Sequence, residues 1–590
     1  MFGRRKRDLF NQIIDRIRQG SLSWSSRFLS VAGKTTMLKS VLAAMPSYTI
    51  SCFKLPVSLC KRIQSALTRF WWDSKAGTKK MCWIAWSKMA QSKRDGGLGF
   101  KDINKFNDAL LAKVSWRILS KPSCLLARIL LGKYCRSSAF LDCSPSNSAS
   151  HGWRGICIGR DLIKTHLGKV IGTRTDTSVW NEPWISLTSS VSPMGPATEQ
   201  SQNLTVDMLI CPLTKTWKRT AIALHLPSYE TDILALKPST RGAPDKLIWL
   251  LTKSGDYSVK TGYNAASFVE AHRANLPAIP FDFNWLKDVW KVHCSPKIKF
   301  LLWKVLKNAL PVGTNLQFRG INASAVCPYC GEEETCLHLF FHCRFARQVW
   351  DQAPVKTLLQ PDRIPTLKLA LEASNRLICL PPTGLGSGPL APWILWTLWS
   401  GRNKLIFEQK HQQSADLLSQ AVILAKEWNI AQIKSPISSK IPRPLPNPEP
   451  GLSTIQLFTD AAWREDSREA GLGWIFIDPI SLAENSFRST ERNVTSPLLA
   501  EAIALLRALN QAVDLGFKHL HVASDSLQLI KALNSELQPK ELYGILHDIS
   551  LISLLFDELH FCFVKRELNC KADGLAKAAL HSLSIVPVLN

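Results

Sequence analysis

Residues 453–590 alternate between short apolar runs and longer segments in which apolar residues recur with helical spacing. In chain order the pattern predicts strands at 454–460, 471–477 and 485–490, a helix at 497–514, a strand at 518–523, a helix from Ser526, a helix near 541–555, a strand at 559–564 and a last helix. Ser496 suits the N-cap of the first helix, Pro497 suits its first position, and Gly516 lies just past its end. This order of elements predicts an α/β fold for the C-terminal part of the chain.

Four acidic residues of this segment stand where the predicted elements begin or end. Asp460 ends the first strand, Glu501 lies early in the first helix, Asp525 follows the fourth strand, and Asp573 lies at the start of the last helix. Carboxylates from separate elements repel one another unless cations lie between them, so the set predicts a divalent-metal site. Oxygen ligands favour magnesium or manganese, and two such ions suit in-line attack on a phosphodiester. A single Asp in such a place is more often a cap or a turn residue, so the indication comes from the joint pattern.

A second group of candidate ligands lies in a short segment rich in cysteine and histidine. The spacing C-x2-C-x7-H-x4-C is formed by Cys327, Cys330, His338 and Cys343. Three thiolates and one imidazole make a closed tetrahedral site for one zinc ion, which predicts a structural role. Gly331 follows the second cysteine, where a tight turn commonly needs a positive φ. Cys336 and His342 are competing ligands, but the apolar residues around His338 suggest a short helix that presents it together with Cys343.

The positive charge of the chain is concentrated near its N-terminus. Residues 1–140 contain 27 Lys and Arg against 6 Asp and Glu, whereas residues 455–590 contain 12 against 17. We therefore expect nucleic-acid phosphates to be bound mainly by the helical, basic N-terminal region rather than by the acidic C-terminal segment. Tryptophans interleaved with these charges could stack on bases, although most of them are expected to build a core; they are Trp71, Trp72, Trp83, Trp86 and Trp116.

Length and composition predict a multidomain protein with a packed core. The chain has 590 residues, of which 46% are hydrophobic, and its longest apolar run, 389–399, is too short to span a membrane. The 16 cysteines are mostly scattered singly, and no secretory signal is visible, so we expect a nuclear or cytoplasmic protein that is not secreted. The basic residues at 1–7 are a candidate nuclear import signal.

The expected domains follow from these patterns. They are a basic region at 1–140, a connector at 141–270, a zinc-binding module at 271–355, a helical connector at 356–433, a proline-rich linker at 434–452 and the α/β domain at 453–590. An extended proline-rich linker should let the last domain move independently.

Several short motifs of the C-terminal segment resemble those of type 1 ribonuclease H domains in plant non-LTR (LINE-type) retrotransposon proteins. They are Thr459-Asp460-Ala461, Gly471-Leu472-Gly473-Trp474, Ala500-Glu501-Ala502, Asp525-Ser526, and Glu567 to Asn569 followed by Ala572-Asp573. The resemblance implies a five-stranded mixed sheet, hydrolysis of RNA paired to DNA, and contacts of Arg566 and Asn569 with the substrate. Many relatives carry a His in the loop before the final carboxylate, and the loop here has none, which implies slower turnover.

The remainder of the chain is similar to other parts of the same proteins. The segment around Cys327 to Cys343 resembles the zinc-binding domain of plant LINE-type reverse transcriptases, and residues 24–117 resemble the thumb-like region that follows the polymerase palm. The paired aspartates of that palm are missing, since the chain contains no Asp-Asp dipeptide. The sequence therefore predicts a truncated or host-retained element without reverse transcriptase activity.

Two functions remain open from the sequence alone. The first is a retrotransposon-derived endonuclease that cuts the RNA strand of RNA–DNA hybrids with two magnesium ions and binds RNA and hybrids through its N-terminal and zinc regions. The second is a catalytically silent nucleic-acid-binding relic. Retention of all four carboxylates favours the first, while the missing palm keeps the second open. The sequence does not indicate an oligomeric state.

Overall fold

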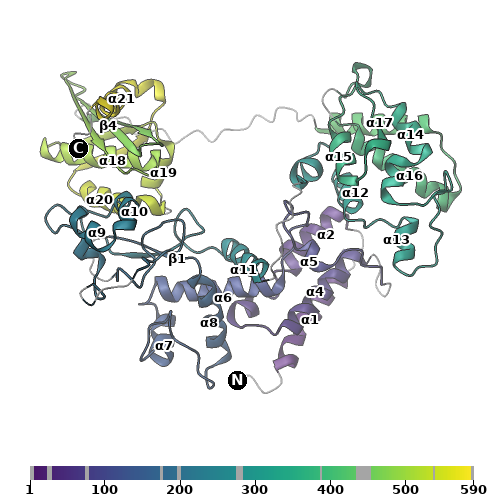
Figure 1. The fold of residues 1–590 in the computed structure, drawn as a ribbon, viewed down its shortest axis with the longest axis horizontal. Coiled ribbons are helices and arrows are strands. Elements are labelled where there is room, and N and C mark those ends of the chain that lie inside the picture. The colour runs from purple at the N-terminus through teal and green to yellow at the C-terminus, as the bar shows by residue number, and fades with distance from the viewer. Residues whose placement is uncertain are drawn as a thin grey trace. The chain divides into compact units, whose positions relative to one another are not determined.

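The computed structural model divides the chain into two compact units, each built from two separate stretches of sequence (Figure 1). The first unit comprises Met1–Asn107 and Val269–Ser439, and the second comprises Asp108–Phe268 and Lys440–Asn590. The structure describes residues 6–22, 29–73, 79–172, 177–195, 199, 201–273, 283–385, 389–432, 454–535 and 538–585. The predicted proline-rich linker and most of the candidate import signal lie outside the described residues.

The first unit consists of helices and connecting loops, with no β-strand among its described residues. Its N-terminal stretch contains α1 (Lys6–Leu22), α2 (Val31–Met37), η2 (Leu38–Leu42), α3 (Ser47–Cys52), α4 (Val57–Trp72) and α5 (Trp86–Met89). Its second stretch contains η5 (Leu286–Trp290), α12 (Pro296–Leu306), α13 (Gly313–Phe318), η6 (His338–His342), α14 (Arg344–Asp351), η7 (Pro361–Arg363), α15 (Leu367–Asn375), η8 (Pro381–Thr383), α16 (Ala391–Glu408) and α17 (Ser414–Gln432). The predicted helical character of this region is confirmed.

The two stretches of the first unit share one core. The Trp303 indole donates a hydrogen bond of 2.9 Å to the carbonyl oxygen of Gly96, and the Trp71 ring packs edge-on against Phe300. Trp71 and Trp86 are buried, as is Trp116 in the second unit. The expectation that most N-terminal tryptophans build a core is therefore confirmed.

The second unit begins with the connector and its flanking helices. Its described elements are α6 (Ile103–Ser120, shared with the first unit), α7 (Leu125–Tyr134), α8 (His151–Lys164), β1 (Leu167–Val170), η3 (Val206–Leu209), α9 (Arg219–His225), η4 (Pro227–Tyr229), α10 (Glu230–Ala235), β2 (Lys246–Trp249) and α11 (Val259–Arg273, also shared). Strands β1 and β2 pair antiparallel. A small core around Trp184 fills the connector.

The remainder of the second unit is a C-terminal α/β domain with a five-stranded mixed sheet. Its elements are β3 (Ile455–Arg464), β4 (Glu469–Ile477), β5 (Glu484–Glu491), α18 (Pro497–Asp514), β6 (His519–Ser524), α19 (Leu527–Leu533), η9 (Lys540–Leu542), α20 (Tyr543–Ser553), β7 (Glu558–Phe563), η10 (Arg566–Leu568) and α21 (Cys570–Ile585). The strand order is β5-β4-β3-β6-β7. Strands β3, β4 and β5 pair antiparallel, whereas β3, β6 and β7 pair parallel, so the predicted mixed sheet is confirmed.

Helix α18 begins and ends where the sequence predicted. The Ser496 hydroxyl accepts a hydrogen bond of 3.1 Å from the backbone nitrogen of Leu499, and Gly516 takes a φ of 75° just beyond the helix. The helix buries a row of alanines and leucines against the sheet, including Ala500 and Ala504. Small side chains let the helix lie close to β3, which fixes the position of Glu501.

Helix α21 lies close to β4 because two glycines of that strand have no side chain. A Cβ atom at Gly471 would lie 2.1 Å from the carbonyl oxygen of Ala576, and one at Gly473 would lie 2.6 Å from that of Ala572. Both distances are too short for non-bonded atoms, so the glycines set the depth at which α21 packs on the sheet. That helix carries Asp573, one of the four acidic residues.

The C-terminal domain makes direct contacts with the connector, which the expectation of an independently moving domain did not include. The carboxylate of Asp548, on α20, is buried and accepts hydrogen bonds from Ser239 and from the backbone and side chain of Thr240. Lys237 forms an ion pair of 2.6 Å with Glu491. The linker composition could not reveal these contacts, because they are made by residues outside the linker.

Among the described residues, no helix is both long and apolar enough to cross a membrane. Helix α16, which contains most of the longest apolar run of the sequence, packs within the first unit against α17 and α12.

Replacing Gly473 by Ala should destabilise the C-terminal domain by about 1–3 kcal/mol, because the new methyl group displaces α21 from the sheet. Gly574 on α21 is a matched control, since a Cβ atom there has no heavy atom within 4 Å. Gly574→Ala should stabilise the helix by about 0.5–1 kcal/mol. Urea unfolding followed by circular dichroism measures both changes. Equal stability of Gly473→Ala and the wild type would contradict this packing.

Candidate active site and zinc centre

Three of the four acidic residues come together at one edge of the sheet. Asp460 lies on β3 and Asp525 directly follows β6, and these neighbouring parallel strands are in register at Thr459 and Ser524. Glu501 lies in the second turn of α18, which packs against β3. Carboxylate oxygens of Asp460, Glu501 and Asp525 all lie within 4.8 Å of one another. The fold thus brings together groups that are far apart in the sequence.

The fourth acidic residue, Asp573, stands beside this trio rather than within it. Its carboxylate accepts a hydrogen bond of 2.6 Å from Lys577 and lies 3.6 Å from a guanidinium nitrogen of Arg566. Its charge still contributes to raising the pKa of Asp460. In this arrangement Lys577 and Arg566 compensate the charge of Asp573.

The trio is held in a state that strongly disfavours three negative charges. Burial, followed by the charge of Asp525, raises the pKa of Asp460 from its ordinary value of 3.8 to about 6. Burial and the charge of Asp460 raise the pKa of Glu501 well above its usual range. Bound cations would remove this cost, because each positive charge favours the ionised carboxylates around it.

The unpaired atoms of the site fit a divalent cation. The Oε2 atom of Glu501, the Oγ1 atom of Thr459 and the Oδ1 atom of Asn569 are buried and have no hydrogen-bond partner within the described part of the chain. Buried polar atoms are normally hydrogen-bonded, so three unpaired oxygens at one carboxylate cluster indicate that a further binding partner, such as a cation, belongs there. The donors are all oxygen, which suits magnesium or manganese.

Asn569 has a positioning contact that the sequence did not indicate. Its side-chain nitrogen donates hydrogen bonds of 3.0 Å to the Thr459 carbonyl and 3.3 Å to the Asp525 carboxylate, and the residue is 1% exposed. Arg566 is exposed and lies next to Asp573. Contacts of Asn569 and Arg566 with a substrate stay a prediction.

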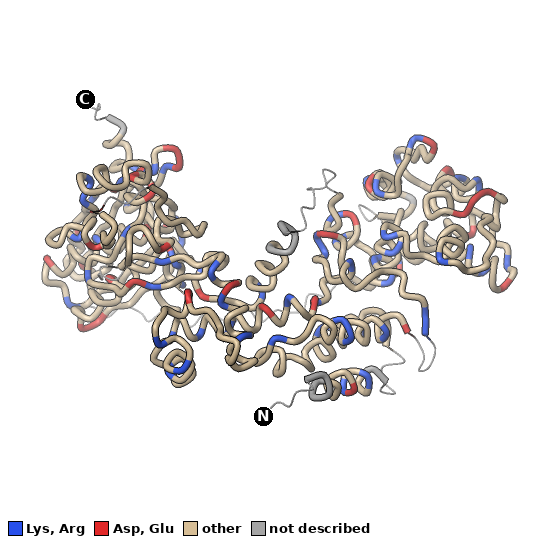
Figure 2. The backbone as a smooth tube through the Cα atoms, turned by 60° about the horizontal axis from the view of Figure 1, so that its bottom comes forward, with Lys and Arg blue, Asp and Glu red and all other residues tan. Residues whose placement is uncertain are grey.

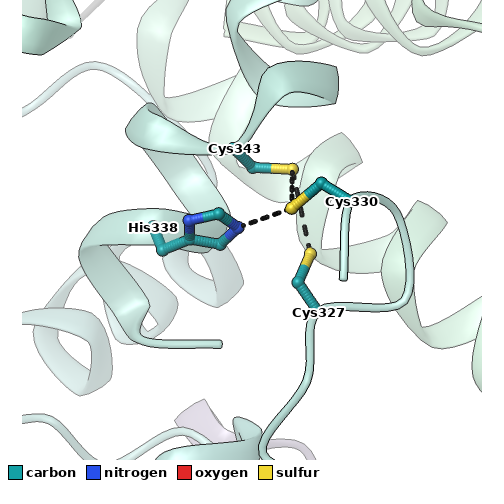
Figure 3. Close-up of side chains that lie close together, drawn as sticks. All are labelled: Cys327, Cys330, His338 and Cys343. Atoms are coloured by element: carbon teal, nitrogen blue, oxygen red, sulfur yellow. Dashed lines mark hydrogen bonds between the residues drawn. The ribbon is translucent and has the colours of Figure 1, made fainter. Parts of the chain in front are cut away.

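In the first unit, the structure gathers the four predicted zinc ligands (Figure 3). Their ligand atoms lie within 4.8 Å of one another, with 3.1 Å between Cys330 Sγ and His338 Nε2 and 3.8 Å between the sulfurs of Cys327 and Cys343. Gly331 takes a φ of 82°, so the expected tight turn is present. The helix predicted around His338 is η6, and Cys343 directly follows it.

The competing candidates point elsewhere. The Cys336 sulfur lies 3.9 Å from the amide nitrogen of Asn315, and the His342 Nε2 lies 3.1 Å from the carbonyl of Ile364. A further residue, Glu332, was not singled out from the sequence: its carboxylate lies 3.3 Å from His338 Nδ1. A carboxylate in this place fixes the ring so that Nε2 faces the thiols. Glu332 is only two residues after Cys330 in the sequence, a proximity that could have indicated its role of orienting His338.

Without an ion, only His338 and Cys343 favour the metal-binding form, because a hydrogen bond with Cys343 and burial raise the pKa of Cys327, and burial raises the pKa of Cys330. Burial lowers the pKa of His338, which keeps the imidazole neutral, and a hydrogen bond from Cys327 lowers the pKa of the Cys343 thiol. A neutral imidazole and an ionised thiol are the forms that bind zinc.

The purified full chain should contain about one zinc ion, which Cys330→Ser should largely remove, because three ligands hold zinc less tightly than four. Cys336→Ser is the matched control and should keep the metal, since its sulfur faces Asn315. Metal analysis by mass spectrometry after dialysis measures both. Full zinc retention in Cys330→Ser would reject the assignment.

Without metal, the stability of the C-terminal domain should fall as the pH rises through about 6, where Asp460 ionises. A carboxyl group whose pKa is raised by folding contributes stability below its unfolded pKa and loses it above its folded pKa. At pH 8 in EDTA, the free energy of unfolding of Asp460→Asn should therefore exceed that of the wild type by on the order of 2 kcal/mol. At pH 4 the two proteins should be equally stable. Magnesium should stabilise the wild type most at pH 8. Urea unfolding measures these differences, with Asp514→Asn, an exposed residue of α18, as control. A wild type whose stability in EDTA matches that of Asp460→Asn at every pH would contradict the repulsion.

Comparison with known protein families agrees with both sites. The model described as "zinc-binding in reverse transcriptase" matches residues 257–350, and the model described as "Reverse transcriptase-like" matches residues 458–579. The first match contains the zinc ligands, and the second contains all four acidic residues.

Two relatives from Arabidopsis thaliana extend this similarity. A putative ribonuclease H protein is 26% identical and aligns with 98% of this chain and 95% of its own length. An uncharacterized mitochondrial protein is 43% identical and aligns with 26% of this chain and 99% of its own length. Among solved structures, ribonuclease H1 from the halophilic archaeon Halobacterium salinarum is 26% identical over 22% of this chain and 98% of its own, with a TM-score of 0.21. The chain therefore carries a zinc-binding domain of the kind described for reverse transcriptases and a reverse transcriptase-like domain, and it is related to both Arabidopsis proteins.

Proposed function

We propose that this protein hydrolyses the RNA strand of RNA–DNA hybrids at the carboxylate cluster of its C-terminal domain. The observation that supports the proposal most strongly is the convergence of Asp460, Glu501 and Asp525 beside three orphaned oxygens. Two divalent ions, when bound, would lower the pKa of an attacking water and stabilise the charge on the leaving 3′ oxygen.

The chain's own residues hold and orient this site. Asp460 is close to Glu501 and Asp525, and the charge of Asp573 also raises its pKa, so it would hold divalent ions together with these other carboxylates. Asn569 holds Asp525 in place through its side-chain nitrogen. Specificity for the RNA strand would come from contacts with the 2′-hydroxyl, which DNA lacks.

Nucleic-acid affinity would come mainly from the first unit, as part of the same proposal. Basic residues recur along its N-terminal stretch, drawn in blue in Figure 2, and many of them are exposed. Several lysines there crowd one another: besides burial, the charge of Lys80 lowers the pKa of Lys34 and of Lys304, the last on α12. Besides burial, the charge of Lys88 lowers the pKa of Lys307. Phosphates would relieve this repulsion, and α12 belongs to the zinc-binding domain.

Asp460→Asn and Asp525→Asn should each lower hybrid cleavage by the full chain at least about a thousandfold, because each removes an anionic ligand. Asn569→Ala should cost about 10–100-fold, since it only orients Asp525. Asp514→Asn should leave the rate unchanged, because Asp514 is exposed at the far end of α18. Single-turnover cleavage of a labelled hybrid with magnesium measures these rates.

Two results would overturn the proposal. One is a wild-type chain that is folded, binds magnesium and leaves hybrids intact, which would favour a silent nucleic-acid-binding relic. The other is cleavage that survives both aspartate substitutions, which would place the chemistry at different residues.

A further inference from the structure

The connector, residues 141–270, is bonded firmly to the catalytic domain in the second unit. Asp548 is 1% exposed and accepts hydrogen bonds of 2.7 and 2.8 Å from the backbone and hydroxyl of Thr240, besides that from Ser239. A Cβ atom at Gly544 would lie 2.9 Å from the backbone nitrogen of Ser239. Such a close, hydrogen-bonded approach fixes the connector against α20.

A second point of attachment lies where the catalytic domain enters η9. The backbone nitrogen of Lys540 donates a hydrogen bond of 2.9 Å to the carbonyl of Lys253, and its side chain donates one of 2.7 Å to the carbonyl of Leu250. The Tyr543 hydroxyl donates one of 3.0 Å to the carbonyl of Pro244. These contacts use backbone atoms of the connector, so they hold its chain rather than one mobile side chain.

Between these attachments, the two parts enclose a cavity of about 690 Å³. Its basic lining residues outnumber its acidic ones by five to two. The connector contributes Lys169, Lys237 and Lys253, and the catalytic domain contributes Arg468 and Lys540, against Asp232 and Glu541. Serine and threonine hydroxyls from both parts also line it. The cavity therefore favours an anionic ligand with several hydrogen-bond acceptors.

Two of the basic side chains are available to such a ligand. Lys169 is paired with Glu182, Lys237 with Glu491, and the Lys540 nitrogen donates to a backbone carbonyl. Lys253 and Arg468, one from each wall, are exposed, and their side chains form no hydrogen bond or ion pair with the described residues. A ligand held by both would connect the connector to the catalytic domain.

The cavity also lies next to the catalytic carboxylates along two helices. Leu498 lines it and is three residues before Glu501 on α18, and Gln528 lines it from the first turn of α19, which begins two residues after Asp525. Residues three apart on a helix are neighbours on its surface, about 5–6 Å between Cβ atoms. A strand cut at the carboxylates, or its partner strand, would thus pass the mouth of this cavity.

We propose that the connector forms the second wall of a nucleic-acid-binding channel, and that its cavity binds the phosphodiester backbone of the hybrid beside the cleavage site. This inference rests on the proposed hybrid substrate. Phosphates match the basic excess, while apolar lining residues such as Leu498 and Ile171 suit the sugar carbons. The connector thereby acquires a role in substrate binding.

The test compares two double variants of the full chain with equal loss of charge. Lys253→Gln with Arg468→Gln removes the two available charges of the cavity, whereas Arg219→Gln with Lys260→Gln removes two exposed charges of the connector outside it. Affinity for a fluorescent 20-base-pair RNA–DNA hybrid is measured in EDTA over a range of salt concentrations, so that binding is separated from cleavage.

The cavity variant should bind about tenfold more weakly than the wild type, and its slope of log affinity against log salt should be smaller by about 1.8, as for two lost phosphate contacts. The control pair should change affinity less than about twofold. Lys253→Arg with Arg468→Lys, which keeps both charges, should bind like the wild type.

Equal losses of hybrid affinity in the cavity variant and the control variant would overturn the inference. A wild type that does not bind the hybrid would also overturn it. Failure of the proposed function is distinguishable. The wild type could bind the hybrid without cleaving it in magnesium, while only the cavity variant loses affinity. This result would support the channel and contradict the proposed hydrolytic activity.

Discussion

The mutual repulsion of carboxylates at the edge of the five-stranded sheet is the constraint on which the C-terminal domain depends. Asp460, Glu501 and Asp525 are brought within 4.8 Å by β3, α18 and β6, although burial and neighbouring charge raise the pKa of Asp460 to about 6. A fold that served stability alone would not place three acids together beside unpaired buried oxygens. The cluster is stable only when cations or protons neutralise it, which links folding of the site to metal binding.

The rest of the domain holds this arrangement with little room for adjustment. Glycines of β4 set the depth of α21 and so the position of Asp573, while alanines of α18 bring Glu501 close to β3. The zinc centre in the first unit is similar in this respect. Its four ligands lie in a segment with little secondary structure, which a bound ion would stabilise. In both sites, a bound metal ion would offset the cost of placing these side chains close together.

Sequence patterns indicated which residues gather at the two candidate sites, but not the way in which the parts are joined. The zinc ligands fall within 17 residues, and the acidic residues stand at the ends of predictable strands and helices, so spacing alone indicated them. Asp548 and Ser239 could not be paired in this way, because they are 309 residues apart and are ordinary residue types. The buried ion pair between Glu334 and Arg402 could not be predicted for the same reason. Contacts between distant segments leave no periodicity in either partner.

The chemistry of the cleaved ends tests the central claim most directly. The full wild-type chain is incubated with an RNA–DNA hybrid labelled on both strands, with magnesium or with EDTA, and the products are identified by mass spectrometry. Hydrolysis by an activated water predicts RNA fragments with 5′ phosphates and 3′ hydroxyls, an intact DNA strand, and no cleavage in EDTA. Fragments with 2′,3′-cyclic phosphates, or cleavage that persists in EDTA, would show that the carboxylate cluster does not perform the reaction.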